Sequence, residues 1–379
     1  MDLISKRDRI DAIDDQMVQL YVERMNIARE IGEEKSKNNL PIENTLRERE
    51  VITRVTSTAP EDLKIYTKMF FENMFETSKG YQTRFVKGNS PTLDKIQAAL
   101  EQGLIAFPEC ANVACQGVPG AYSQIAADKV FKLANISYFK DWGGVFNAIE
   151  KNFCQFGVLP IENSNAGSVN GVYDLMHKNN FFISRAVKLR IQHYLLAKKG
   201  ADVSKIKEIF SHEQAIAQCS EFLASMPNVK VTIVDNTATA AKMVAESNSL
   251  EVACISSRDC AGIYGLGILK ANVQGNDNNF TRFIIISKNL QPYEGANKIS
   301  IMVNTPHEAG ALNSILNRFS TLGLNLTKLE SRPIENTTFE FAFYFDFEAK
   351  ITRNEVQNLI GDLENSCELF VFLGSYEEI

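Results

Sequence analysis

QGNDNNFTRFIIIS, residues 274–287, sets six polar or glycine residues against the strand-like run FTRFIIIS. Thr281 and Arg282 lie where the loop meets the strand. They place a hydroxyl and a cation at the mouth of a strand whose apolar residues predict that it is buried, which calls for an explanation. Side chains alternate along a regular strand, so Arg282 is expected to point away from Thr281 and to bind an interface rather than a substrate.

The strand at 280–287 is the last of five strand-like runs that alternate with helical stretches between residues 110 and 290. This alternation is typical of an α/β domain. Residues 1 to about 86 have apolar residues at helical spacing and only two glycines, which predicts helices alone. From Asn297 onward, the order strand, helix, strand (324–331), strand (338–347), helix, strand predicts a ferredoxin-like α+β unit. We expect three domains, at residues 1–88, 108–290 and 297–379.

The composition argues against several classes of partner. Among the 379 residues, 40 basic and 46 acidic side chains give a net charge of −6 without a basic stripe, so no nucleic-acid partner is expected. Four histidines without metal-ligand spacing predict no metal, and we expect no cofactor. Seven cysteines without a CxxC pair fit reduced thiols. No run approaches the ~20 apolar residues of a membrane span, so we expect no membrane partner and a cytoplasmic location.

The first helical segment carries cations on an apolar face. Apolar residues at spacings of three and four mark the face: Ile10, Ile13, Met17, Leu20, Ile27 and Ile31. Arg7, Arg24 and Lys35 continue it. Cations there are costly unless they are paired, snorkelling or binding an anion. A single one would most simply flank the core, but three favour an anion site.

The distances along this helix predict a shared site. At ~1.5 Å per residue, Arg24 and Lys35 lie roughly 16 Å apart, which two long side chains span by reaching towards one small ligand. Arg7 lies roughly 25 Å from Arg24 by the same rise, too far to share that ligand. An antiparallel second copy of the helix would supply its own Arg7, so the sequence predicts a dimer.

The next two helices also carry polar groups near apolar faces. Arg47 and Glu48 open a helix whose apolar face continues through residues 51, 52 and 55. Ser78 and Gln82 extend a stripe begun by Phe70 and Met74, four residues apart. Two ordinary alternatives stay open: Ser78 bonds back to its own helix, and Gln82 is solvated.

Residues 1 to about 86 resemble the all-helical chorismate mutase family. The resemblance rests on Arg7, ERMNIAREIGEEK (23–35), Pro41 followed by NTLRERE (44–50), and Ser78 with Gln82. It implies that chorismate is bound by a set of eight residues, with Arg7 supplied by the partner chain. The set comprises Arg7, Arg24 and Arg47 on the carboxylates, Lys35 and Gln82 as catalytic donors to the breaking ether oxygen, Glu48 on the hydroxyl, Ser78, and Asn44 where some members carry Asp.

Such a site needs no nucleophile. A [3,3] rearrangement builds negative charge on the ether oxygen, and preplaced donors stabilise that charge more than they stabilise the ground state. Holding both carboxylates also fixes the reactive conformer.

The middle segment places polar residues after three strands. The stretches are GVPGAYS (117–123), GVLPIENSNAGSVNGVYDLM (157–176) and FSHEQAIAQC (210–219). Ser211 serves equally well as a helix N-cap. PIENS, SHEQ and above all NFTRF resemble prephenate dehydratase over residues 110–290, which implies a two-lobed, periplasmic-binding-protein-like α/β fold. The resemblance makes Thr281 catalytic, and the implied prephenate contacts are Glu162, Asn163, Ser164, Ser211, Gln214 and Thr281.

Prephenate loses carbon dioxide and a ring hydroxyl together, so the site must assist the departing hydroxyl. Thr281 supplies a donor, and we hypothesise that Glu162 relays its proton. The first stretch departs from the family, with Val118 and Ala121 where members commonly carry proline and a hydroxyl residue.

The last segment resembles the ACT domain attached to prephenate dehydratases, on GALNSIL (310–316) and LESRPI (329–334). The resemblance implies phenylalanine as a feedback inhibitor and a homodimer or homotetramer, since such units commonly pair. The ordinary alternative is that Gly310 permits close packing and Arg332 pairs on the surface. The implied regulatory residues are Gly310, Ala311, Leu312, Asn313, Glu330, Ser331 and Arg332.

The order of the three resemblances predicts a bifunctional enzyme that converts chorismate through prephenate to phenylpyruvate. A mutase fused to prephenate dehydrogenase would need a glycine-rich dinucleotide turn, of which YGLGILK (264–270) has only part. A metabolite sensor is the non-enzymatic alternative, and it predicts binding without turnover.

Overall fold

The computed structural model describes residues 3–38, 40, 44–83, 90–305, 310–333 and 341–379. The chain forms two compact units. The first comprises residues 1–95, 302–345 and 352–371, and the second comprises 96–301, 346–351 and 372–379. The last predicted domain, 297–379, thus contributes to both units, and the predicted domain boundaries stay predictions.

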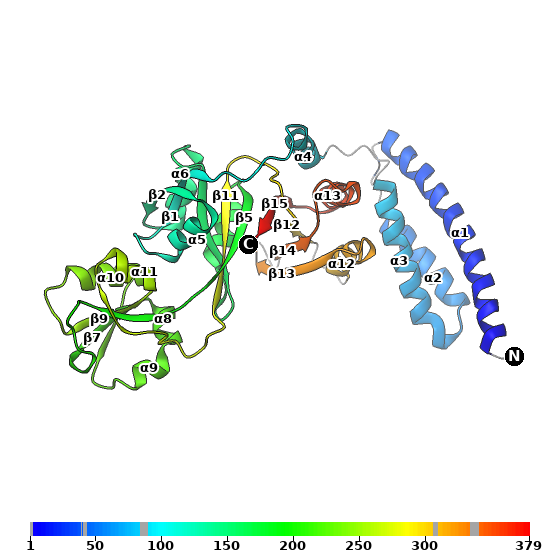
Figure 1. Ribbon diagram of the computed structural model, residues 1–379. Helices are drawn as coiled ribbons and strands as arrows, with labels where there is room; N and C mark the ends of the chain where they lie inside the picture. Colours follow the sequence, from blue (N-terminus) through cyan, green and yellow to red (C-terminus); the bar gives the residue numbers. More distant parts are fainter. Residues whose placement is uncertain (1–2, 39, 41–43, 84–89, 306–309, 334–340) are drawn as a thin grey trace. The chain divides into compact units, whose positions relative to one another are not determined.

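The amino-terminal part of the first unit is helical, as predicted. It consists of α1 (Leu3–Lys37), α2 (Thr45–Thr58), the 3-10 turn η1 (Glu61–Leu63) and α3 (Lys64–Thr83). Helix α3 lies beside α1 and beside α2 (Figure 1). Asn44 caps α2, because its side chain accepts a hydrogen bond from the Arg47 backbone N–H at 3.0 Å. A further helix, α4 (Pro91–Glu101), follows.

The second unit is built on two sheets. Its larger sheet runs in the order β2-β1-β3-β11-β5-β15, with β4 (Gly167–Ser168) paired to β3. Strands β1 (Cys110–Gln116), β2 (Leu133–Phe139) and β3 (Phe156–Asn163) are parallel, and β11 (Phe280–Ser287) lies antiparallel between β3 and β5 (Phe182–Arg190). The helices of this part are α5 (Tyr122–Val130), α6 (Trp142–Glu150) and α7 (Asn170–Lys178). A buried core that includes Val113, Val158 and Phe283 joins α5 to the sheet.

The smaller sheet has the order β10-β6-β9-β7-β8. Its strands are β6 (Tyr194–Ala197), β7 (Glu208–Ser211), β8 (Lys230–Ile233), β9 (Val252–Ser256) and β10 (Gly267–Lys270). The helices and turns are η2 (Val203–Lys205), α8 (Glu213–Gln218), α9 (Ser220–Ala224), α10 (Thr237–Glu246) and α11 (Arg258–Ile263). The chain enters this lobe after β5 and returns to the larger sheet before β11, so residues 191–193 and 271–279 form two connections (Figure 1).

The carboxyl-terminal segment has the predicted order of elements. These are β12 (Lys298–Asn304), α12 (Ala311–Thr321), β13 (Asn325–Pro333), β14 (Phe341–Glu348), α13 (Asn354–Ser366) and β15 (Phe370–Glu378). Part of the strand predicted at 338–347 lies outside the described residues. The strand order β13-β14-β12-β15 is that of a ferredoxin-like sheet. Gly374 lets β15 approach β5, because a Cβ there would lie 2.3 Å from the Ile183 carbonyl oxygen.

The described residues contain neither a membrane-spanning helix nor a metal-binding cluster. None of their helices is long and apolar enough to cross a membrane. Within the same ranges, the fold brings together no group of three or more His, Cys, Asp or Glu side chains that would hold a metal ion.

Candidate active sites

Thr281 lies beside Asn163 on neighbouring strands. The two residues face each other across β11 and β3, and both are buried. The Asn163 amide nitrogen donates to Thr281 Oγ1 at 2.8 Å and to Asn279 Oδ1 at 2.8 Å. The Asn163 oxygen accepts the backbone N–H groups of residues 165 and 166, which fixes the orientation of this amide. Thr281 therefore accepts a hydrogen bond from Asn163 and keeps its own hydrogen to donate.

The hydrogen bonds continue from Asn279 into the smaller lobe. Because Asn279 turns its oxygen towards Asn163, its nitrogen donates to Gln218 Oε1 at 2.8 Å. His193 Nε2 lies 2.8 Å from the same oxygen, so this ring nitrogen carries the proton. Burial lowers the pKa of His193, and its Nδ1 has no hydrogen-bond partner within the described part of the chain. The network thus ends on a neutral, buried imidazole.

Sequence reasoning missed three members of this network. Asn279 precedes the quoted NFTRF residues by one place, and Gln218 follows Gln214 by one helical turn, so adjacency to a motif was a usable signal for both. His193 lies in the connection before β6 and carried no signal, since a lone histidine there is usually structural.

Ser164 holds the loop before β11 in place. Its hydroxyl accepts from the Phe280 N–H at 3.0 Å and donates to the Asn278 carbonyl at 3.0 Å. Its own N–H donates to the Phe280 carbonyl at 2.8 Å. The hydroxyl thus binds backbone next to Thr281.

Glu162 lies on the wrong face for the hypothesised relay. The β3–β11 register pairs Glu162 with Arg282 and pairs Asn163 with Thr281. Residues paired across a ladder share a face, and neighbours along a strand do not. The Glu162 side chain therefore leaves β3 on the side opposite Thr281, which contradicts a direct proton relay between them.

Arg282 behaves as predicted. It is 7% exposed, and its guanidinium contacts Asp346 and Glu378 at 2.5 and 2.6 Å. It therefore binds an interface with strands of the carboxyl-terminal segment, on the face of β11 away from Thr281.

Ser211 and Gln214 lie at the start of α8 in the smaller lobe. Ser211 is fully buried and donates to the Ile255 carbonyl at 2.8 Å. The N-cap alternative for Ser211 is wrong, because His212 occupies that place and its ring nitrogen accepts from the Gln214 N–H at 3.3 Å. Gln214 is exposed, one turn before Gln218 and on the same helix face, so it faces the Asn279 end of the network.

The loop GVPGAYS contacts the smaller lobe through its backbone. Gly120 has φ +87°, and a Cβ there would lie 2.6 Å from Cys260 Sγ, so only glycine fits. Tyr264 donates its hydroxyl to the Pro119 carbonyl at 2.7 Å. Ala121 occupies the N-cap of α5 and offers no hydroxyl. The hydroxyls of Tyr122 and Ser123 already donate to the carbonyls of Gln192 and Gln116 at 2.7 Å, so the backbone N–H groups are what this loop offers to a ligand.

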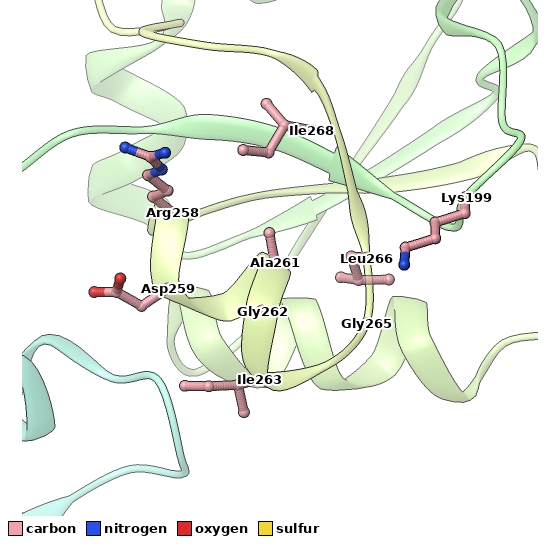
Figure 2. Close-up of a pocket in the computed structure, with 9 residues that line it drawn as sticks. All are labelled: Lys199, Arg258, Asp259, Ala261, Gly262, Ile263, Gly265, Leu266 and Ile268. Atoms are coloured by element: carbon pink, nitrogen blue, oxygen red, sulfur yellow. The ribbon is translucent and has the colours of Figure 1, made fainter.

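A pocket of about 900 Å³ lies elsewhere, over α11 and β10 (Figure 2). It is broadly open to solvent, and Figure 2 shows Arg258 and Lys199 on different segments around apolar side chains such as Ile268. None of the predicted substrate residues lines it. Size alone is weak evidence for a functional site beside the buried, oriented hydroxyl of Thr281.

The order of elements around YGLGILK contradicts the dinucleotide alternative. Gly265 lies between the end of α11 and strand β10, and Gly267 is the first residue of β10. A dinucleotide-binding turn instead follows a strand and opens a helix. The chain direction here is reversed, so this turn offers no helix N-terminus to a pyrophosphate.

Arg24 and Gln82 form the centre of the candidate mutase site. The Arg24 guanidinium lies 5.7 Å from the centroid of the Phe75 ring, and burial lowers its pKa. Arg24 Nη1 and Gln82 Oε1 are both buried and lack hydrogen-bond partners in the residues that the structure covers. Buried polar atoms without partners are costly, so a polar ligand is expected between these helices.

Gln82 and Ser78 support each other on α3. Both are buried, and the Gln82 amide nitrogen donates to Ser78 Oγ at 3.3 Å. The solvated alternative for Gln82 is therefore wrong. Rotation of the Gln82 amide by 180° would let Ser78 donate to Oε1 and would free the N–H group for a ligand.

Gly32 of α1 makes room for Gln82, and replacing it tests the site. A Cβ on Gly32 would lie 3.1 Å from Gln82 Cβ, which forces the amide to move. We expect Gly32→Ala to lower mutase kcat roughly tenfold, because small displacements of a donor are costly in catalysis. Gly80→Ala on α3 is the matched control, since a Cβ there meets nothing within 4 Å. Equal mutase activity in the two variants would contradict this role for Gly32.

The remaining predicted mutase residues lie around this centre or away from it. Lys35 is half-buried near the end of α1, and Glu48 lies 3.6 Å from Lys79 of α3. Arg47 is exposed and pairs with Glu50 at 3.0 Å. Arg7 is exposed on α1, far from Arg24 in the same chain. Asn44 caps α2, and Pro41 lies outside the described residues.

The apolar face of α1 is uncovered in a single chain. Only Ala28 and Gly32 of the helix are buried. The exposed fractions of the predicted face run from 44% at Met17 to 66% at Leu20, for Ile10, Ile13, Met17, Leu20, Ile27 and Ile31. A contiguous exposed apolar face marks an interaction surface.

The predicted regulatory residues lie at the start of α12 and the end of β13. Gly310 is the N-cap of α12 with φ +93°, and a Cβ there would meet no atom of the described residues within 4 Å. The glycine is needed for its backbone conformation, so the close-packing alternative is wrong. Ala311 and Leu312 are half-buried and Asn313 is exposed. On β13, Glu330 and Arg332 share one half-buried face, and Ser331 points to the other.

Comparison with known proteins agrees with this geometry. A family model of chorismate mutase type II matches residues 6–83, and one of prephenate dehydratase matches residues 113–291. A bifunctional chorismate mutase/prephenate dehydratase of Buchnera aphidicola subsp. Schizaphis graminum is 31% identical, over 99% of this chain and 96% of that protein.

Two solved structures are also similar. The prephenate dehydratase of Arthrobacter aurescens in complex with L-Phe is 27% identical with a TM-score of 0.63, over 70% of this chain and 90% of its own. GqqA, described as a quorum quenching acylase, is 28% identical with a TM-score of 0.64, over 70% of this chain and 98% of its own.

Proposed function

Because this chain belongs to the family of bifunctional chorismate mutase/prephenate dehydratases, we propose that each of its two activities uses one of the sites described above. The enzyme rearranges chorismate to prephenate and converts prephenate to phenylpyruvate, in phenylalanine biosynthesis. The observation that carries the dehydratase assignment is the buried Thr281 hydroxyl, oriented by Asn163 with its hydrogen free to donate.

We assign chorismate to the space between α1 and α3. Arg24 and Arg47 hold the carboxylates, Lys35 and Gln82 donate to the breaking ether oxygen, and Glu48 binds the hydroxyl. The unpartnered Nη1 of Arg24 supports this assignment, because it lies buried where the oxygens of a dianion would accept from it. The Gln82 amide supports it as well, because a rotated amide would direct its N–H to the ligand and its Oε1 to the Ser78 hydroxyl. Ser78 orients Gln82, and Asn44 acts through the cap that sets Arg47 at the start of α2.

We propose that two chains share each mutase site. The uncovered apolar face of α1 supports this, because a second α1 lying antiparallel would bury that face and bring its Arg7 to Arg24. The assembly is a homodimer, or a homotetramer if the carboxyl-terminal segments pair as well.

Mixing two inactive variants tests the shared site. Arg7→Ala and Arg24→Ala should each abolish mutase activity alone, because each removes one cation from every site. In chains refolded together at equal amounts, half of the dimers are mixed and one site in each is intact, so roughly a quarter of the wild-type activity should return. Light scattering measures the mass of each sample and so reports whether the chains are dimers. A mixture as inactive as its components would contradict sharing.

For dehydration we assign the end of β11 and the loops around it. The Thr281 hydroxyl donates to the departing hydroxyl of prephenate, and Asn163 holds it in place. Ser164, Ser211 and Gln214 complete the site from both lobes. The Glu162 side chain leaves β3 on the face opposite Thr281, so we assign it no role as a proton relay.

We further propose that the carboxyl-terminal segment is an ACT domain that binds phenylalanine as feedback inhibitor. The ferredoxin-like strand order and the left-handed Gly310 at the start of α12 support this, as does the L-Phe complex of the Arthrobacter relative. The ligand residues would be 310–313 and 330–332. Phenylalanine inhibits only if it binds one conformation of the enzyme better than another.

We also propose a cytoplasmic location. The seven cysteines are free, and burial raises the pKa of those inside the core, such as Cys219 to about 12. Such thiols are inert and suit a reducing compartment.

The first experiment supplies purified protein with chorismate and follows prephenate and phenylpyruvate separately. Both products should appear in sequence, and added prephenate should be converted without chorismate. Accumulation of prephenate with no phenylpyruvate would contradict the second activity. Binding of chorismate or prephenate without conversion of either would favour the metabolite sensor instead.

A further inference from the structure

The strand that carries Thr281 is anchored from its other face by a buried ionic cluster. Arg282, the next residue, directs its guanidinium to three acceptors. Nη1 contacts Asp346 Oδ2 at 2.5 Å, Nη2 donates to the Tyr376 hydroxyl at 2.6 Å, and Nε lies 2.6 Å from Glu378 Oε2. The last contact is an ion pair without hydrogen-bond alignment. Ser300 completes the cluster, within 2.5 Å of Asp346 and 2.7 Å of Tyr376.

The cluster is saturated, so Arg282 is not available to a substrate. The guanidinium side chain is 8% exposed and already faces two carboxylates. Two lysines also pair with Glu378: Lys298 inside the cluster at 3.0 Å and Lys188 at its exposed rim at 2.8 Å. Burial alone would raise the pKa of Glu378, but Arg282 and the two lysines outweigh it and hold the pKa at about 2. The single positive charge of Arg282 thus already faces two carboxylates and leaves no position on the guanidinium for a third anion.

The position of the cluster matters because the register of β11 changes beside it. Thr281 and Arg282 pair with Asn163 and Glu162, and the register against β3 then shifts between Arg282 and Phe283. An irregularity of this kind re-aims the neighbouring side chains. A slip of one residue would turn Thr281 to the opposite face and remove it from Asn163. An anchored Arg282 excludes that slip, since the slip would withdraw the guanidinium from both carboxylates.

We infer that Arg282 is a positioning residue for dehydration, which holds Thr281 against Asn163 by binding Asp346 and Glu378. Both carboxylates come from strands β14 and β15 of the carboxyl-terminal segment. Dehydration therefore depends on that segment even without a regulatory ligand. The inference rests on the proposed role of Thr281.

The test compares kcat and KM for prephenate in full-length variants. Arg282→Met should lower kcat roughly 100-fold, the effect of a misplaced catalytic group, with KM nearly unchanged. Asp346→Asn should lower kcat in the same way but less, because Glu378 still holds the guanidinium. Arg282→Lys should recover part of the loss, since one ammonium reaches only some of the three acceptors. The double variant Arg282→Met/Asp346→Asn should fall no further than Arg282→Met.

Lys188→Gln is the matched control, because it removes one of the cations that pair with Glu378. The Lys188 side chain is 57% exposed, so its loss should leave kcat within about twofold. Mutase activity in the same chains reports that the rest of the protein is folded. Wild-type kcat in Arg282→Met, or a raised KM with unchanged kcat, would overturn the inference. If Arg282→Met does not fold, Asp346→Asn decides by the same criteria. Failure of the wild-type chain to form phenylpyruvate would instead refute the proposed function.

Discussion

Thr281→Val should reduce the conversion of prephenate by roughly 10²- to 10⁴-fold, the usual contribution of a positioned proton donor. Valine matches threonine in shape, so the strand and its core contacts are retained while the hydroxyl is lost. The hydroxyl is the group that the structure orients, because Asn163 donates to its oxygen and leaves its hydrogen free. The measurement is kcat for phenylpyruvate formation from added prephenate.

Two comparisons make the Thr281 result specific. Thr281→Ser keeps the donor and should retain much more activity than Thr281→Val. Both variants should rearrange chorismate at the wild-type rate, because the proposed mutase residues lie on α1, on α3 and at the start of α2, whereas Thr281 lies on β11. Loss of both activities in a folded Thr281→Val chain would contradict separate sites.

The surroundings of Thr281 show what a sequence can and cannot predict about a site. Alternation along β11 was enough to place Arg282 on the far face, because that rule is local. The partners of Arg282 were not predictable: Asp346 and Glu378 come from strands more than sixty residues away. The same limit explains the wrong relay through Glu162. Proximity in the motif PIENS suggested contact with Thr281, but the cross-strand register decides which neighbour faces it.

The helical segment was more predictable because its signal is periodic. The apolar face of α1 was visible from spacings of three and four, and its exposure in a single chain follows from the same pattern. The contact of Gly32 with Gln82 was not visible, since it joins residues on two helices fifty positions apart. Likewise, the N-cap role of His212 required the observed end of β7, which the sequence places only within a few residues.

Lys35→Ala should lower the rearrangement of chorismate by roughly 10³-fold, the upper range for removing one donor to a developing oxyanion. The half-buried Lys35 lies on α1 one turn after Ile31, on the seam that also carries Arg24. A cation there stabilises the ether oxygen only as its bond breaks, so the loss should appear in kcat more than in KM.

Lys37→Ala is the control for this variant, since Lys37 is exposed in the same last turn of α1 and should leave the mutase unchanged. Added prephenate should still be dehydrated by Lys35→Ala at the wild-type rate, because Thr281 and its network belong to the other compact unit. A loss in Lys35→Ala no larger than that in Lys37→Ala would show that Lys35 is not part of the site. If Lys35→Ala lost both dehydration and rearrangement while its mass and helicity were unchanged, the two reactions would not use separate sites.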